Sequence, residues 1–151
     1  MKKSKIIIKE DCLEDAILVS RQIPEFEFVY PESEYNSRLK DVNHLILTAY
    51  INSKPVGLKI GYETSSKQHF YSWMGGVLPK YRQLGIAERL MEYQEHWAMN
   101  TGYQRILVKT RTKYAAMIKL LQKHQFHQTG TIPYSPDKET RILYEKKLKL
   151  F

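Results

Sequence analysis

The stretch that decides the fold is GGVLPKYRQLGIA, residues 75–87, because it joins an apolar segment directly to an amphipathic one. The segment before it, HFYSWMGGV at 69–77, is rich in aromatic residues and is typical of a β-strand. The segment after it carries apolar residues at spacings of four, three and four, namely Ile86, Leu90, Tyr93 and Trp97. This periodicity predicts a helix over 84–101, and Gly102 stands where that helix would end. With the apolar strand RILVKT at 105–110, the three segments form a parallel βαβ crossover.

The segments on either side of the crossover predict one mixed α/β fold. We expect five further strands, at 5–9, 44–51, 55–64, 126–133 and 141–148. We expect three further helices: one that starts with capping-box spacing at Asp11 and Glu14 and stops before Pro24, a short one ending near Leu39 after a loop, and one over 113–124. The fold class is therefore α/β, with a single mixed, mostly antiparallel sheet and a central parallel βαβ crossover flanked by helices.

Length and composition narrow the class of protein. A chain of 151 residues is the size of one domain, so residues 1–151 are expected to form a single domain. No apolar run approaches the ~20 residues that cross a bilayer, and the N-terminus lacks the apolar stretch of a signal peptide. The lone Cys12 has no partner for a disulfide or a CxxC metal site. We therefore expect a cytoplasmic protein with no membrane partner and no bound metal.

The net charge of +8 is unevenly distributed. Residues 1–99 carry equal numbers of acidic and basic residues, so the whole excess lies in residues 100–151. Such a bias is typical of a solvated basic face, but it also suits an anionic ligand, whether a polyphosphate or a nucleic acid. Charge alone leaves these alternatives open.

The turn at 82–87 has the chemistry of a phosphate site. The start of a helix exposes unpaired N–H groups and the positive end of the helix dipole. Gly85 and Ala87 leave these backbone groups accessible, while Lys80 and Arg82 add positive charge nearby. Neither a GxxxxGK[ST] motif nor a G-x-S-x-G motif is present, which disfavours nucleotide hydrolysis and a serine nucleophile.

The pattern Arg82-x-x-Gly85-x-Ala87, after a strand ending Val77-x-Pro79, resembles the acyl-CoA pyrophosphate loop of the GNAT superfamily of N-acetyltransferases. The order of elements over residues 5–149 also matches, and HQF at 124–126 stands where the family commonly begins a strand with Gly-Phe. The resemblance implies a GNAT-like acyl-CoA N-acyltransferase fold and acetyl-CoA as the acetyl donor.

The resemblance also implies how the donor is held. Main-chain groups of Val77 would bind pantetheine, and the backbone of the loop would bind the pyrophosphate, through Arg82, Gln83, Leu84, Gly85, Ile86 and Ala87. Strands 69–77 and 105–110 would separate near Val77, a break that a bulge at Gly75-Gly76 would favour. An acceptor amine would attack the thioester directly, without an acyl-enzyme, and a backbone N–H near Val77 would stabilise the oxyanion.

The catalytic side chains depart from the family pattern. Relatives often carry a carboxylate six residues ahead of the equivalent of Val77, where this chain has Tyr71. Glu63 on the neighbouring strand is the nearest carboxylate in sequence and is the candidate base, with a surface charge as the alternative. Tyr71 is a candidate proton relay or, equally, a core or substrate-wall aromatic. The family's common Asn falls on Thr112, which the resemblance makes a further candidate for binding the cofactor. The family's common acid Tyr falls on Leu121, with Tyr114 nearby.

The acceptor is an amine of unassigned identity: a small molecule, a peptide N-terminus or a lysine side chain. If the resemblance holds, it lies under the acidic, aromatic segment 24–36, which contains Glu25, Glu27, Glu32 and Glu34. The sequence is also compatible with a homodimer. Two other readings stay open, a catalytically silent CoA-binding domain and a basic nucleic-acid-binding domain on the same fold, although no motif favours nucleic acid.

Overall fold

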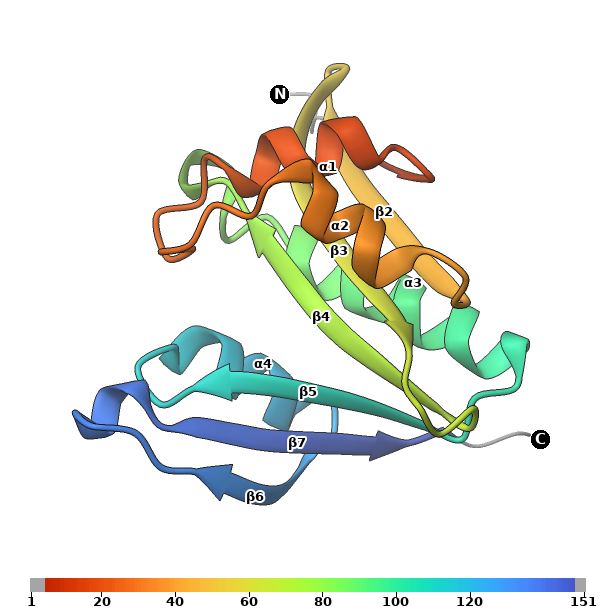
Figure 1. Ribbon diagram of the computed structural model, residues 1–151. Helices are drawn as coiled ribbons and strands as arrows, with labels where there is room; N and C mark the ends of the chain where they lie inside the picture. Colours follow the sequence, from red (N-terminus) through yellow and green to blue (C-terminus); the bar gives the residue numbers. More distant parts are fainter. Residues whose placement is uncertain (1–4, 149–151) are drawn as a thin grey trace.

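The computed structural model describes residues 5–148 and contains one seven-stranded sheet (Figure 1). Its spatial order is β1-β2-β3-β4-β5-β7-β6. The strands are β1 (Ile6–Glu10), β2 (His44–Ile51), β3 (Lys54–Glu63), β4 (His69–Val77), β5 (Arg105–Arg111), β6 (His127–Ile132) and β7 (Arg141–Lys147). Only β4 and β5 pair in parallel, and every other neighbouring pair is antiparallel. The predicted fold class is therefore confirmed.

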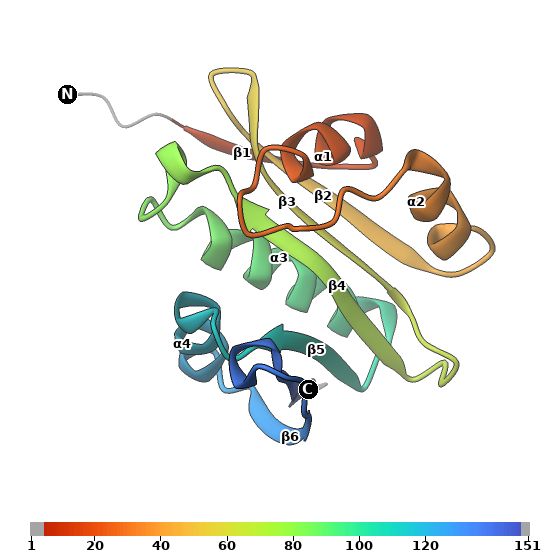
Figure 2. The same ribbon diagram turned by 60° about the vertical axis from the view of Figure 1, so that its left-hand side comes forward.

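Four helices cover the sheet. Helices α1 (Leu13–Ser20) and α2 (Glu32–Leu39) lie on one face of β2–β4, while α3 (Ile86–Thr101) lies on the other (Figures 1 and 2). Helix α4 (Ala115–Lys123) packs behind β5. Each face has its own apolar core, one around α1 and α2 and a larger one under α3 and α4. No helix within residues 5–148 has the length and apolar character that a membrane crossing requires.

The capping box predicted at Asp11 and Glu14 is wrong. Cys12 occupies the N-cap position of α1, and no side chain caps the helix. Asp11 has a φ of 65° and its N–H donates to the carbonyl of Ile46, so it forms the tight turn between β1 and α1. Asp tolerates this left-handed conformation better than most residues, which explains why a capping residue type stands at a turn position.

Strands β4 and β5 diverge at the crossover. Their last pair is Ser72 with Val108, although β4 continues to Val77 and β5 to Arg111. Residues 73–77 of β4 and 109–111 of β5 no longer pair with each other, and we call these two strand ends the fork. Figure 1 shows the fork opening away from the paired ends of the two strands. The predicted separation near Val77 is confirmed.

The bulge that accompanies the fork is not at Gly75-Gly76, so that prediction is wrong. Gly75 and Gly76 pair regularly with β3, and the register shifts where Trp73 is left without a partner. The glycine at 76 serves packing instead, because a Cβ there would lie 2.5 Å from the Ile23 side chain. The extra residue at Trp73 reverses the alternation of side chains along β4, since residues on either side of a bulge change faces.

Candidate active site

The turn into α3 presents a row of free backbone amides. The first helical bond runs from the Arg89 N–H to the Gly85 carbonyl, and within the described chain the N–H groups of residues 83–88 have no backbone acceptor. Gln83 and Gly85 have φ angles of 64° and 82°, which turn the chain sharply before the helix. A Cβ at Gly85 would meet nothing within 4 Å, so the space in front of the loop is open. Such an array of N–H groups at a helix start suits a phosphate group.

The β4 side of the fork adds a second set of main-chain groups. The Leu78 N–H donates to the Val56 carbonyl at 2.8 Å, so in this antiparallel pair the groups of Gly75 and Val77 point away from β3. They point toward the side of β4 on which β5 would pair if the two strands did not diverge. An extended ligand with amide groups could pair here as an added strand does.

The Arg82 side chain is held by two groups of the chain and is not free to reach the amide loop. Its Nε donates to the Val77 carbonyl at 3.0 Å, and its guanidinium lies 2.8 Å from the Glu25 carboxylate. The hydrogen bond from Arg82 lowers the pKa of the Glu25 carboxyl. An anion bound by the Arg82 side chain would therefore compete with Glu25.

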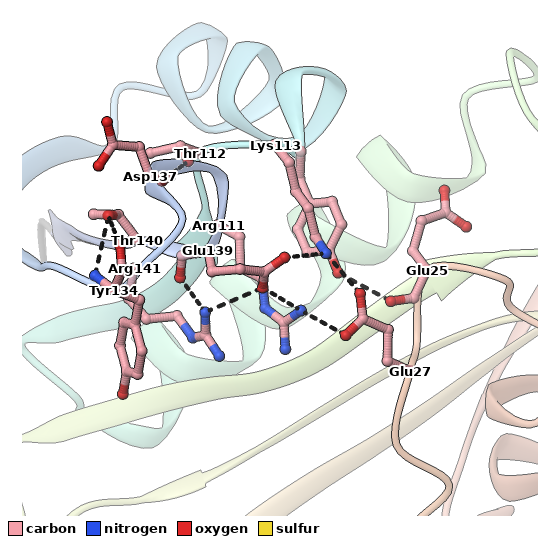
Figure 3. Close-up of polar contacts among 11 residues, drawn as sticks. Glu25, Glu27, Arg111, Thr112, Lys113, Tyr134, Asp137, Glu139, Thr140 and Arg141 are labelled. Atoms are coloured by element: carbon pink, nitrogen blue, oxygen red, sulfur yellow. Dashed lines mark hydrogen bonds and ion pairs between the residues drawn. The ribbon is translucent and has the colours of Figure 1, made fainter.

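The segment between α1 and α2 crosses the fork (Figure 3). The Glu27 carboxylate lies 2.6 Å from the Lys113 amine and 3.3 Å from the Arg111 guanidinium, both beyond or at the end of β5. Tyr114 OH donates to the Glu25 carbonyl at 2.9 Å. Glu139, from the β6–β7 connection, accepts from the same two cations. Three of the four glutamates expected to attract a cationic acceptor, Glu25, Glu27 and Glu34, are thus paired with the chain's own cations.

Glu63 lies away from the fork. It pairs with Phe70 at the end where β4 and β5 are still joined, and its carboxylate accepts a hydrogen bond from Tyr103 OH at 3.0 Å. That bond and burial raise the pKa of the Tyr103 hydroxyl to about 12, with burial the larger cause. The structure does not bring Glu63 together with Val77 and the loop, and its role as the base stays a prediction without geometric support.

Tyr71 faces the side of the sheet that carries α2. Its ring makes an edge contact with Tyr62, with centroids 5.5 Å apart, and Tyr62 in turn contacts Trp73. Burial raises the pKa of the Tyr71 hydroxyl to about 12, so at neutral pH it is a proton donor and not a base. This placement suits the substrate-wall reading of Tyr71.

Thr112 and the α4 residues are held by other contacts. Thr112 Oγ1 donates to the Asp137 carbonyl at 2.8 Å, which ties the end of β5 to the β6–β7 connection (Figure 3). Leu121, at the family's acid position, is fully buried, and Tyr114 OH is already bonded to Glu25. The role of Thr112 in binding the cofactor stays a prediction. The sequence leaves no candidate for the acid that would protonate the leaving thiolate.

One group of metal-type ligands lies outside the fork. Single ligand atoms of Glu88, Glu92 and His124 lie within 4.8 Å of one another. Glu88 already pairs with Lys123 at 3.1 Å and with His124 at 3.0 Å. Glu88 is therefore already engaged by two neighbouring side chains of the described chain.

The fork, the amide loop and the sheet order are the features expected of an acyl-CoA-dependent transferase, and the class itself is shown by comparison with known proteins. The model of the acetyltransferase (GNAT) family matches residues 16–126, so the chain belongs to this family and is an acetyl-CoA-dependent N-acetyltransferase. No curated protein sequence matches it significantly.

Solved structures share the fold at low identity. Ard1 from Thermoplasma volcanium is 16% identical with a TM-score of 0.82, covering 96% of this chain and 99% of that one. The ribosomal-protein-S18-alanine N-acetyltransferase from Escherichia coli is 16% identical with a TM-score of 0.81, over 97% and 96% of the two chains. An aminoglycoside 6'-N-acetyltransferase complexed with coenzyme A is 14% identical with a TM-score of 0.77, over 96% and 98%.

Sequence reasoning missed two features of the site. The Glu25–Arg82 pair joins residues far apart in the chain, and no local pattern signals it. Lys59, buried on β3 opposite Gly75, was also missed. Here a signal existed, because a lysine between Leu58 and Ile60 in the apolar run of β3 breaks the composition of a strand that is buried on both faces.

Proposed function

We propose that this N-acetyltransferase binds the acetyl-CoA pyrophosphate on the amides of residues 83–88 and lays pantetheine along the β4 side of the fork. The observation that carries the proposal is the row of unpartnered amides that opens onto free space at Gly85. The thioester would then lie near Gly75 and Val77, whose N–H groups could bind the carbonyl oxygen and stabilise it as it becomes an oxyanion, an effect worth ~3 kcal/mol in other acyl-transfer sites.

The acceptor amine would approach from the face that carries α1 and α2 and attack the thioester directly. This side of the sheet is lined by an aromatic group formed by Tyr30, Tyr35, Tyr62, Tyr71 and Trp73. Because the nearby glutamates are already ion-paired, the wall supports an amine with apolar surroundings better than a polycation. An amine on a peptide or small molecule fits this chemistry, and the amine must lose its proton before it attacks. The lone Cys12 suits a reducing, cytoplasmic setting for this reaction.

A matched pair of glycine variants tests the cofactor loop. Gly85→Val strains a residue at φ 82° and places a side chain over the amides, so acetyl-CoA should no longer raise the melting temperature and thiol release should stop. Gly102→Val imposes similar strain at φ 103° at the opposite end of α3. It should lower stability comparably and leave the acetyl-CoA response intact. Unchanged acetyl-CoA affinity in Gly85→Val would remove the loop assignment.

The same assays separate the other readings of this fold. A silent CoA-binding domain would show the thermal shift with no thiol release on any amine. A nucleic-acid-binding domain would show salt-sensitive retention on DNA or RNA and no response to acetyl-CoA.

A further inference from the structure

Lys59 is the one lysine of the described chain whose side chain lies inside the core. Its residue is 7% exposed, and among residues 5–148 it forms no hydrogen bond or ion pair. A buried amine without an anionic partner is costly, so its presence calls for a physical reason. Its position on β3, directly opposite Gly75 of the fork, supplies one.

The Lys59 amine lies against the fork on the α3 face. A Cβ at Gly75 would stand 3.2 Å from Lys59 Nζ, so the amine packs on the β4 backbone where that residue has no side chain. The neighbouring Gly57, on the same face of β3, lies against Ile86 and Leu90 of α3. The amide loop leads directly into α3, so it lies at the start of the helix that covers this face.

A second polar group shares this layer. Gln94 continues the buried stripe of α3 that includes Ile86 and Leu90, and its Nε2 is buried without a hydrogen-bond partner. Gln94 Nε2 is the buried side-chain donor of the described chain that has no partner, and because buried polar atoms are otherwise paired, it indicates that a polar ligand group belongs in this layer.

We propose that Lys59 is the acid that protonates the coenzyme A thiolate as it leaves, an assignment that rests on the proposed transfer at the fork. The acceptor nitrogen forms its bond to the thioester carbonyl carbon, and the tetrahedral adduct collapses with cleavage of the carbon–sulfur bond. The electron pair of that bond goes to sulfur, which takes a proton from the Lys59 ammonium. The nitrogen releases its extra proton to water, and Lys59 regains a proton from solvent.

The chemistry of Lys59 matches this task. Burial alone lowers the pKa of its amine to about 8, and no titratable group contributes. The elements packed on it place Leu47 of β2, Gly75 of β4 and the stripe of α3 beside it, none of which titrates. A thiol ordinarily has a pKa of about 8.5, so proton transfer from Lys59 to the thiolate is close to balanced. The other candidates are occupied or apolar, because Tyr114 OH is bonded to Glu25 and Leu121 has no proton to give.

Three variants test the assignment in the full-length chain with acetyl-CoA and an accepted amine. Lys59→Met should lower kcat about 100-fold, with the acetyl-CoA thermal shift unchanged. Wild-type kcat should fall as pH rises through about 8, and this alkaline limb should vanish in Lys59→Met. Lys59→Arg keeps a positive charge that does not titrate in this range, so it should fail to restore kcat if proton donation is the role. Lys54→Met, exposed on the same strand, is the control and should match wild type.

Each contrary result rules out one part of the mechanism proposed for Lys59 and the fork. Normal kcat and an intact alkaline limb in Lys59→Met remove Lys59 and leave the proposed transfer in place. Full activity in Lys59→Arg assigns charge stabilisation and removes proton donation, while an acetyl group found on wild-type Lys59 by mass spectrometry makes it a nucleophile. A wild-type chain that binds acetyl-CoA yet releases no thiol on any amine overturns both proposals.

Discussion

The two halves of the sheet on either side of the fork are built differently. Strands β2 and β3 are almost entirely buried, because α1 and α2 cover one face and α3 the other. In β6, by contrast, only Gly130 is even half-buried, and α4 is the one helix that packs behind this half. The net charge follows the same division, since the whole excess lies in residues 100–151. The first half is therefore a packed platform. The second half is a more exposed, basic flap, which is joined to the platform along four residue pairs of β4 and β5 and through the apolar core under α3 and α4.

This difference explains where a ligand would have most influence. The fork lies where the platform ends. The contacts that cross it are a hydrogen bond from Tyr114 OH to the Glu25 carbonyl and ion pairs of partly exposed side chains, such as Glu27 with Lys113. Such ion pairs contribute little to the free energy of unfolding, and salt screens them. A cofactor bound along the fork would add contacts to both halves, so it should stabilise the flap more than the platform.

The largest expected effect contrasts one glycine from each half. In Gly61→Ala, the new Cβ would stand 2.3 Å from the Phe70 ring and 2.7 Å from the Tyr71 carbonyl, so we expect a loss of about 3 kcal/mol or more in the free energy of unfolding. In Gly130→Ala on β6 the nearest atom, of Leu143, is 3.6 Å away, and the change should stay within about 0.5 kcal/mol. Urea denaturation of both variants measures this, and equal losses would contradict the contrast between platform and flap.

The second-largest effect concerns the charge of the Lys59 amine, which is buried in the platform. The unfolded chain holds the Lys59 proton up to the ordinary lysine pKa, whereas the folded chain releases it at about 8. The unfolded state therefore binds more protons between these values, and this lysine makes stability rise with pH from about 8 to about 10. Above that range, the raised pKa values of Tyr71 and Tyr103 reverse the trend.

Lys59→Met removes this cost. At pH 7 it should raise the free energy of unfolding by about 2 to 3 kcal/mol and abolish the rise between pH 8 and 10. Lys147→Met, at an exposed position of β7, is the control from the flap and should leave the pH profile unchanged. Thermal unfolding across this pH range checks both, and a destabilised Lys59→Met would show that the amine has a partner that binds its charged form.

The smallest effect tests the link between the halves. Lys113 lowers the pKa of the Glu27 carboxyl, so the pair contributes at neutral pH and is lost as pH falls through that lowered value. Glu27→Gln should lower the melting temperature slightly at low salt and not at about 1 M salt, where screening is nearly complete. Glu32→Gln, in the same segment and without an ion pair in the described chain, is the control. A loss that persists at high salt would mean that Glu27 acts through packing.

The parts of the site that the sequence predicted are those formed by neighbouring residues. The amide loop depends on Gly85 and the start of one helix, so strand, turn and helix signals within 69–101 suffice to locate it. Glu63 was the nearest carboxylate in sequence, yet the hairpin register places it beside Phe70, at the joined end of β4 and β5. The bulge was expected at two glycines, but packing against Ile23 accounts for one of them and the register shift falls at Trp73.

The sequence by itself determined the order of the elements, the crossover and the phosphate-type turn, because periodicity and glycine placement act within a few residues of one another. Only the tertiary structure decided which groups meet around the fork: Arg82 with Glu25, Glu27 with Lys113, and Lys59 with the backbone of Gly75. Those contacts join segments far apart in the chain, and they depend on strand register and on which face of the sheet each residue occupies, which a shift of one residue reverses.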